Sequence, residues 1–576
     1  MTRHLILNNR YYCSRNAELT EIAVTKPAAA INQNAQIDKT SVPKEQPISP
    51  KSREIVLGVV GYAGSGCSQV STKLSDLLEA IDFECHVIKM SSLIADQFPE
   101  RIPSSSEKQD GKSRMARVQV FQDLGDELRE QHTAAVASLS VKEIIRRRGD
   151  KKPGTDKIAY IIDSLKHADE VHLLRTVYGE SFHLIGVHCD RSQREGRLGG
   201  EKGLTQRKFS GVPRDELKKF LDRDEKDNER KFGQGVRDTF YLSDYFLDNN
   251  PDGLPDLPHL NNDLARLISL ITGNGIVRPT SLERAMYHAF SASLQSACLS
   301  RQVGASVLTH DGRIIATGSN EAPKFGGGVY GEGDENDHRC YLWKFEQQDG
   351  SPFIGCHNTR KKNEFKKKAA KWFAENIAEK LAEAVMPPKE GALPRIDETL
   401  LQTTSAKIKK ALIANEELFE KLPGVNDLIE YSRSIHAEMN AILNAARGGE
   451  STNGCILLCT TFPCHNCARH LVAAGISKVC YIEPYTKSLA VELHSDSIIT
   501  EVPASWVKDP TLQDKMVVVP FSGAGPRMYE HHFTKRSEIK DSFTGEYRPL
   551  EAGEAINGVR LIDLERVEKT AADLVN

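Results

Sequence analysis

The fold of this chain is decided by residues 434–484, SIHAEMNAILNAARGGESTNGCILLCTTFPCHNCARHLVAAGISKVCYIEP. Apolar residues recur at helical spacing after His436 and stop at two glycines, and a strand-like run follows over 455–460. The helical spacing resumes after Cys464, and a second strand-like run covers 478–482. The segment therefore predicts helix, strand, helix, strand, which is typical of an α/β domain.

The same segment carries the pattern of a metal site, with H-x-E at His436 and P-C-x-x-C ending at Cys467. H-x-E is expected about once by chance in this composition, whereas P-C-x-x-C is expected only about 0.01 times. Cys464 and Cys467, three residues apart on a first helical turn, present their sulfurs to one side, where the helix N-terminus favours thiolates. With His436 they supply three ligands to Zn²⁺ and leave one position for water, as catalytic zinc sites do.

Glu438 is not a ligand in this arrangement, and we predict that it moves protons. Zinc lowers the pKa of water, and the hydroxide attacks a ring carbon that bears an exocyclic amine. The Glu438 carboxylate carries the proton to the ring nitrogen and to the leaving ammonia. A structural zinc knuckle is the alternative, but His465 points elsewhere on its helix, and Cys455 and Cys459 are expected to be core thiols of a strand. The predicted reaction is hydrolytic deamination.

At these residues the chain resembles the cytidine and deoxycytidylate deaminase superfamily. The resemblance extends to residues 300–323, SRQVGASVLTHDGRIIATGSNEAP, which are similar to the first hairpin of deoxycytidylate deaminases with its T-G-x-N-x-x-P turn. It implies that Asn320 binds the sugar or base. Arg301, as a phosphate contact, and Phe462 and Tyr485, packing against the base, are weaker candidates. For Asn320 the alternative is an amide that fixes the turn through its own side chain.

Residues 54–80, EIVLGVVGYAGSGCSQVSTKLSDLLEA, predict a strand, a glycine-rich turn and a helix. Gly61, Gly66 and Ser68 stand where a G-x-x-x-x-G-K-[ST] phosphate loop has its glycines and hydroxyl, and Gly64 is a further glycine between them, but Cys67 replaces the lysine. Backbone amides can still cradle phosphate and Ser68 can still hold Mg²⁺. The charge that stabilises a transferring phosphoryl group is missing.

The residues after this loop continue an alternation of strands and helices. Strand-like runs at 85–90, 158–162 and 182–188 alternate with helical spacing at 118–129 and 136–148, which predicts a parallel, doubly wound sheet. The charged stretch 191–231 suits an exposed lid or helical hairpin.

Three residues of this half resemble nucleotide-kinase residues. Asp163 looks like the acidic residue that ends the second strand of a phosphate-loop fold, and Arg175 and Arg191 resemble lid or sensor arginines. We predict a kinase-like domain that binds a regulatory nucleotide with Mg²⁺ without efficient phosphoryl transfer. The alternative is a structural relic, since glycine loops also make tight turns.

The predicted fold class is α/β, with an N-terminal parallel-sheet P-loop kinase-like domain (54–274) and a C-terminal zinc-dependent cytidine-deaminase-like α/β/α domain (281–535). The second domain is expected to open with a helix from Ser281 and a hairpin of strands 303–308 and 313–317. The remaining segments are a flexible leader (1–53), a helical insertion (341–430) and a C-terminal extension (536–576). The insertion carries one apolar stripe on a helix that is expected to pack: Phe365, Ala369, Trp372 and Phe373.

Composition restricts the setting. The formal charge of −3 is too small for a protein that coats a polyanion through its bulk field, and 12 Cys in 576 residues are too sparse for a disulfide scaffold. No apolar run approaches the roughly 18 residues of a membrane helix, and the N-terminus lacks the apolar core of a signal peptide. A cytoplasmic protein without membrane contact is expected.

A kinase-like half followed by a deaminase half, with the ending PFSGAGPRMYEHHF at 520–533, is similar to the bacterial anti-phage dCTP deaminases. The resemblance implies conversion of dCTP, and also of dCMP, to uracil nucleotides, which drains the pool that a phage needs. It also implies a homo-oligomer and an inhibitory small RNA.

Two other functions stay open at this point. An RNA or DNA cytosine editor would need a basic track, for which 146–152 and 360–371 are the candidates, although both are expected to be solvated helix faces. A regulatory nucleotide sensor would use the phosphate loop and a degenerate deaminase, which the intact zinc motif argues against. Cys340, Cys356 and His357 are candidates for a second metal site, against a favoured interpretation as ordinary thiols.

Overall fold

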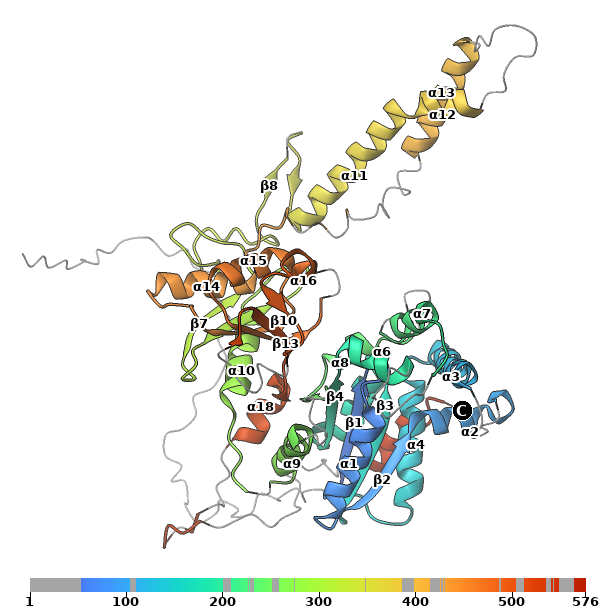
Figure 1. Cartoon of the computed structure of the whole chain (residues 1–576), viewed down its shortest axis with the longest axis vertical. Coiled ribbons are helices and arrows are strands. Elements are labelled where there is room, and N and C mark those ends of the chain that lie inside the picture. Colours follow the sequence, from blue (N-terminus) through green and yellow to red (C-terminus); the bar gives the residue numbers. More distant parts are fainter. Residues whose placement is uncertain are drawn as a thin grey trace, which may run out of the picture. The chain divides into compact units, whose positions relative to one another are not determined.

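The computed structural model describes residues 53–575 except for 104–109, 200–208, 226, 228–232, 251–257, 274, 348, 386–397, 415–424, 426–427, 429, 486–487, 504–511, 535–539, 542 and 548–563. Within this part of the chain the strands form two six-stranded sheets and a two-stranded ribbon (Figure 1). The predicted leader lies outside the described residues, apart from Arg53. Among the described helices, none has the length and apolar content to cross a bilayer.

The first sheet has five parallel strands in the order β5-β4-β1-β3-β2, with a short antiparallel strand, β14, beside β5. Its central strand β1 is buried at every position between β3 and β4, which explains its continuous apolar sequence. The parallel strands are β1 (Ile55–Gly61), β2 (Glu84–Lys89), β3 (Ile158–Leu165), β4 (Phe182–His188) and β5 (Tyr245–Asp248).

Helices cover both faces of this sheet, as the alternation of strands and helices predicts. Leu57 and Val59 of β1 pack with α1 and α9, whereas Val56 and Val60 pack with α4 and α5 on the opposite face. The charged stretch after β4 forms two helices in mutual contact, α6 and α7, but the prediction that this stretch is exposed is wrong for Leu198, Leu217 and Phe220, which are buried in one cluster. The helices are α1 (Cys67–Glu79), α2 (Met90–Gln97), α3 (Gly111–Gln131), α4 (Ala135–Arg148), α5 (Ala168–Tyr178), α6 (Arg191–Gly199), α7 (Arg214–Glu225), α8 (Val236–Phe240) and α9 (Pro258–Thr272).

The second sheet has the order β12-β13-β11-β10-β6-β7, in which β10, β11, β13 and β12 are parallel and β6 and β7 form the predicted hairpin. Helices α14 and α15 pack on one face and α10 on the other. The predicted order of helix, strand, helix, strand is confirmed. The elements are α10 (Ser281–Ser293), β6 (Gly304–Leu308), β7 (Ile314–Ser319), α14 (Ala437–Arg447), β10 (Ile456–Thr461), α15 (His465–Ala473), β11 (Lys478–Glu483), α16 (Ala490–Leu493), β12 (Ile498–Ile499) and β13 (Met516–Pro520).

The insertion between β7 and α14 contains the ribbon β8 (Phe345–Glu346) and β9 (Pro352–Phe353), then α11 (His357–Asn376), α12 (Ala378–Val385) and α13 (Glu398–Ala414), which pack against one another. The prediction that the stripe of α11 is packed is wrong for its aromatic members. Trp372 is 56% exposed, and Phe365 and Phe373 are also exposed.

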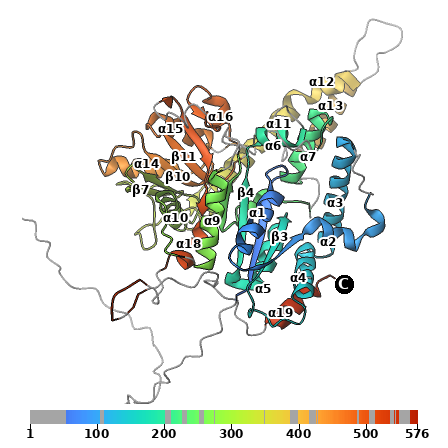
Figure 2. The same ribbon diagram turned by 60° about the horizontal axis from the view of Figure 1, so that its bottom comes forward.

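Two segments that follow the second sheet pack on the first, and the sequence did not predict this. Strand β14 (Gly523–Ala524) pairs with β5, and helix α18 (Pro526–Phe533) contacts α9. Helix α19 (Leu564–Ala572), which belongs to the predicted extension, lies beside α4 (Figure 2).

The contact between α19 and α4 is fixed by a buried ion cluster. The guanidinium of Arg148 donates to the carboxylates of Glu54 and Glu568, with shortest N–O distances of 2.8 Å and 2.6 Å. A buried guanidinium between two carboxylates is costly to break, because removal of one partner leaves an uncompensated charge.

The contact of α18 with β4 predicts a pH-dependent stability. His183 and His532 lie edge to face with ring centroids 5.1 Å apart. Burial lowers the pKa of His183 to about 4 and of His532 to about 3, and the Arg175 charge adds to the shift at His183. Because the unfolded chain then binds more protons, this stability is present above the ordinary histidine pKa and is lost as the pH falls towards the folded values.

We expect the free energy of unfolding to fall by about 1.4 kcal/mol per histidine between pH 7.5 and 5.5, one unit below the ordinary pKa. Urea unfolding at the two pH values measures this loss. His532→Asn, whose amide can still donate to the Met528 carbonyl that His532 Nδ1 contacts, should reduce it. An equal loss in both proteins would contradict the assignment.

Candidate zinc and substrate site

The three predicted zinc ligands stand at the starts of two neighbouring helices. His436 is the N-cap of α14, and Cys464 is the N-cap of α15. Cys467 lies in the first turn of α15 and donates its backbone N–H to Cys464 Sγ at 3.4 Å. Since α14 and α15 contact each other, the positions of the three residues at the two helix starts bring their side chains together.

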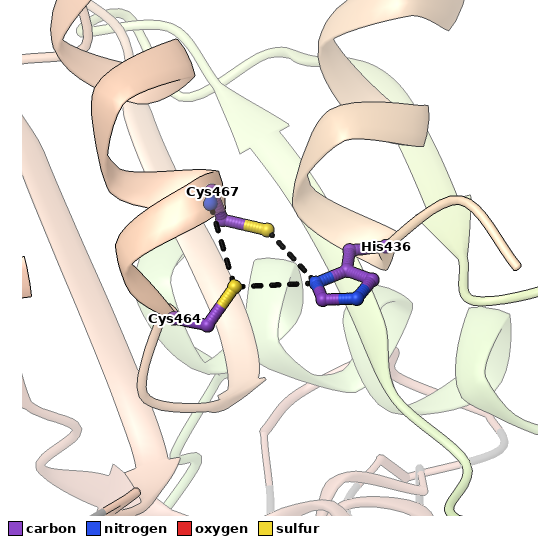
Figure 3. A group of neighbouring side chains, drawn as sticks. All are labelled: His436, Cys464 and Cys467. Atoms are coloured by element: carbon purple, nitrogen blue, oxygen red, sulfur yellow. Dashed lines mark hydrogen bonds between the residues drawn. The ribbon is translucent and has the colours of Figure 1, made fainter. Parts of the chain in front are cut away.

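The ligand atoms converge with the geometry that zinc requires (Figure 3). His436 Nδ1 lies 3.3 Å from Cys464 Sγ and 3.3 Å from Cys467 Sγ. A tetrahedral zinc with ordinary Zn–N and Zn–S bonds separates such atoms by about 3.5 Å. All three atoms lie within 4.8 Å of one another, so the residues fit a three-ligand zinc site with one position left for water.

The charges at this site favour a bound cation. Cys464 has its pKa lowered to about 4, by hydrogen bonding with Cys467 and then with His436. Burial raises the pKa of Cys467, and its hydrogen bond with Cys464 and the nearby charges of Glu438 and Cys464 raise it further. Hydrogen bonding to Cys464 raises the pKa of His436 to about 8. A cation between the sulfurs would stabilise both thiolates and leave the imidazole neutral.

Glu438 lies in the first turn of α14, is buried, and lines the same cavity as His436 and Cys464. Burial raises the pKa of its carboxyl, and the nearby His436 partly opposes that shift. A buried carboxyl with a raised pKa, facing a cavity beside a metal site, has the properties of a general acid and base.

The cavity in front of these residues has a volume of about 290 Å³. The four predicted substrate contacts all line it: Arg301, Asn320, Phe462 and Tyr485. The structure therefore brings the substrate candidates and the metal candidates to one site, although the hairpin and the zinc motif are separated by more than a hundred residues of sequence.

Asn320 is held by the hairpin itself. Its Oδ1 accepts from the Val303 backbone N–H at 2.7 Å, and its Nδ2 donates to the Arg301 carbonyl at 2.8 Å. These bonds agree with the alternative interpretation of an amide that fixes the turn, and its contact with substrate stays a prediction. Arg301 forms an ion pair with Glu483.

Arg433 lines the cavity and was not predicted. Its Nη1 donates to the His338 carbonyl at 2.7 Å, and its guanidinium lies 4.1 Å from the ring centroid of Trp343. The only sequence signal is its place three residues before His436. Trp343 belongs to the insertion, and no periodic pattern in the sequence indicates that this part of the insertion lies beside the cavity.

The suggested second metal site is not formed. Among the described residues, His436, Cys464 and Cys467 are the group whose potential ligand atoms converge, and Cys340, Cys356 and His357 do not make another. The imidazole of His357 instead stacks on Trp343, with ring centroids 5.2 Å apart.

The predicted phosphate-loop residues come together between β1 and α1. Gly64 and Gly66 have φ values of +85° and +94°, which glycine adopts without strain, and Gly66 is the N-cap of α1. The Ser68 hydroxyl donates to Asp163 Oδ2 at 2.7 Å.

The two predicted sensor arginines make other contacts. Arg175 binds Asp244 and the Leu242 carbonyl. Arg191 pairs with acidic residues of α6 and α7.

An α/β sheet that carries three convergent nitrogen and sulfur ligands beside a buried carboxyl is the arrangement of a hydrolytic zinc centre. Residues 404–483 match the family model described as the cytidine and deoxycytidylate deaminase zinc-binding region. The C-terminal region therefore contains a domain of the cytidine/deoxycytidylate deaminase family.

Relatives agree over this short region. The chain is 48% identical over 54 residues to the deoxycytidylate deaminase of Enterobacteria phage T2, covering 9% of this chain and 29% of the phage protein. It is 41% identical over 70 residues to ComE operon protein 2 of Bacillus subtilis (strain 168), covering 12% of this chain and 37% of that protein. The match thus spans well under half of either relative.

A solved structure aligns over a longer part of the chain. The apo dCMP deaminase of cyanophage S-TIM5 aligns with 42% of this chain and 99% of its own, at 17% identity and a TM-score of 0.19.

Proposed function

We propose that the C-terminal region catalyses zinc-dependent hydrolytic deamination of deoxycytidine nucleotides, dCTP and also dCMP, to deoxyuridine nucleotides and ammonia. The observation that carries this proposal is the convergence of His436, Cys464 and Cys467 beside the buried Glu438 in one cavity. The biological role we propose is depletion of the dCTP pool in anti-phage defence in the cytoplasm.

In this proposal each residue has one task. When bound, zinc lowers the pKa of a water molecule and so supplies a nucleophile at neutral pH. Glu438 takes one proton from that nucleophile and delivers it to the ring nitrogen, and it then moves a second proton from the hydroxyl added to the ring carbon to the leaving amine; its raised pKa is suited to both transfers. Phe462 and Tyr485 provide apolar surface for the base within the cavity.

The nucleotide specificity rests on two arginines of the cavity wall. Arg301 and Arg433 both line it, so a phosphate group of the substrate has guanidinium partners within reach. The relative called deoxycytidylate deaminase, from phage T2, supports a nucleotide rather than a free nucleoside as substrate.

A substrate panel tests the proposal. Purified protein is incubated with dCTP, dCMP, CTP, deoxycytidine and a cytosine oligonucleotide, and ammonia release is followed. We expect kcat/KM for the deoxycytidine nucleotides to exceed that for deoxycytidine by about 100-fold, since one lost charged hydrogen-bond partner costs about 1.5–3 kcal/mol. Release from the oligonucleotide alone would reject a nucleotide substrate in favour of the editing function.

The contacts of the first basic segment argue against an editor. Arg146 and Arg147 pair with Glu143, and Arg148 lies in the buried cluster with Glu54 and Glu568. Lys151 pairs with Glu84. These cations are neutralised within the chain, so they do not form the open basic track that single-stranded nucleic acid requires.

A regulatory nucleotide with Mg²⁺ at the loop 61–68 is a second part of the proposal. The hydrogen bond between Ser68 and Asp163 supports it, because a hydroxyl and a carboxylate of this kind are suited to hold Mg²⁺ beside a phosphate. The homo-oligomer and the inhibitory small RNA belong to the same proposal and rest on the resemblance alone.

A further inference from the structure

The loop 61–68 has no lysine of its own, but an ammonium group reaches it from another strand. Cys67 is buried, and burial raises the pKa of its thiol to about 11, so it supplies no charge. Lys166, directly after β3, places its Nζ 3.3 Å from the Gly61 carbonyl oxygen. The ammonium group of Lys166 therefore supplies a cation at the loop, in place of the motif lysine that the sequence lacks.

A carboxylate already occupies the loop. Asp224 of α7 is only 2% exposed, and its Oδ2 accepts from the Ala63 backbone N–H at 2.6 Å. Its Oδ1 accepts from Lys166 Nζ at 2.9 Å. An anionic oxygen held by a loop amide and an ammonium group occupies the kind of position that a phosphate oxygen takes at the start of a helix.

A second cation beside the loop has a spare donor. Arg194 of α6 is 4% exposed, and its guanidinium lies 4.9 Å from the ring centroid of the loop residue Tyr62. Its Nε and Nη2 donate to the Cys189 carbonyl and to Glu225, but its Nη1 has no partner in the part of the chain that the structure describes. A buried guanidinium N–H without an acceptor is costly unless a ligand satisfies it.

We propose that the loop 61–68 is a polyphosphate site in which Asp224 stands in for a phosphate group. A nucleoside triphosphate displaces this carboxylate, and its terminal phosphate takes the Ala63 amide and Lys166. Mg²⁺ bound to the same phosphates would be held by Ser68 and Asp163. This site would bind the regulatory nucleotide of the proposed function, on which the inference rests. Lys166 would substitute for the missing lysine of the motif, and Asp224 would occupy the loop when no nucleotide is bound.

The charges explain why the position of Asp224 matters for affinity. Lys166 and the loop amide serve either the carboxylate or the phosphate, so the carboxylate competes with every nucleotide that enters. Asp224 lies on α7, so its side chain must leave the loop when a phosphate enters, while Arg194 on α6 stays beside the loop. Phosphate binding and displacement of the Asp224 carboxylate are therefore coupled in this proposal.

Calorimetric titration with MgATP, and separately with inorganic triphosphate, tests the proposal in the full chain. Asp224→Asn removes the competing charge and is expected to bind both at least 10-fold more tightly than the parent protein. Lys166→Ala is expected to weaken both at least 10-fold, and Lys166→Arg to recover part of the loss. Asp215→Asn, an exposed position on the same helix, is the matched control and should leave the affinity unchanged.

The outcomes separate this site from the deaminase. All titrations are repeated in a Glu438→Gln background, where nucleotide affinity should be unchanged whether or not the deaminase proposal holds. Equal affinities in the parent protein, Asp224→Asn and Lys166→Ala, or no binding in any of them, would overturn the proposal. If Asp224→Asn does not fold, as thermal unfolding will show, the Lys166 pair decides. Binding of MgATP but not of inorganic triphosphate would overturn the phosphate assignment.

Discussion

Glu438→Gln is expected to lower kcat for deamination of dCTP and dCMP by about 10³-fold or more while the zinc content stays the same. The amide keeps the shape of the side chain but cannot accept a proton, and positioned acid–base groups contribute about 10²–10⁴-fold. Glu438 carries the proton in two successive transfers in the proposed mechanism, so the loss should lie at the upper end. Ammonia release and metal analysis of the same sample measure the two quantities.

The matched control for this variant is Glu450→Gln. Glu450 is a surface carboxylate that pairs with Arg313 and has no contact with the cavity. It should retain parental kcat, because an exposed ion pair contributes little. Full activity in Glu438→Gln would remove this residue from the mechanism, and loss of zinc in that variant would show that Glu438 supports the metal site instead.

The zinc site could be predicted from the sequence because each of its parts is local. His436 and Cys464 are N-caps, and Cys467 follows one turn later, so the spacing within two short segments fixes where the ligand atoms point. The strand β10 between the two helices then sets their separation. The fold of residues 434–484 could be predicted for the same reason, since β10 and β11, which follow each other in sequence, are neighbours in the sheet.

Contacts between distant elements could not be predicted. Strand β14 has only two residues, Gly523 and Ala524, too few for any period to show, yet it extends the first sheet. Lys166 and Asp224 look like ordinary surface charges in the sequence, and only the packing of α7 against the loop gives them a role. Trp372 is the opposite case, a residue predicted to pack that is exposed. A helical stripe indicates that one face of the helix is apolar but does not indicate which element packs on it.

The last prediction concerns the metal itself. The Cys467→Ser protein is expected to lose its zinc during dialysis and to have no deaminase activity. The thiolate contributes both a ligand bond and a negative charge, and a serine hydroxyl stays protonated at neutral pH. Changes in residues that merely orient ligands cost about 10–100-fold in affinity, so loss of one of three direct ligands should cost more.

Cys459→Ala is the control that separates a ligand from a buried thiol. Cys459 is also fully buried, lies on β10 next to the site, and has its pKa raised by burial, but its sulfur is not among the convergent ligand atoms. It should keep its zinc and its activity at the cost of a small loss of packing. Equal zinc contents in Cys467→Ser and Cys459→Ala would reject the three-ligand site. Zinc loss in Cys467→Ser alone would show that the Cys467 thiolate binds the metal. Both cysteines are buried, but only the Cys467 sulfur lies among the convergent ligand atoms.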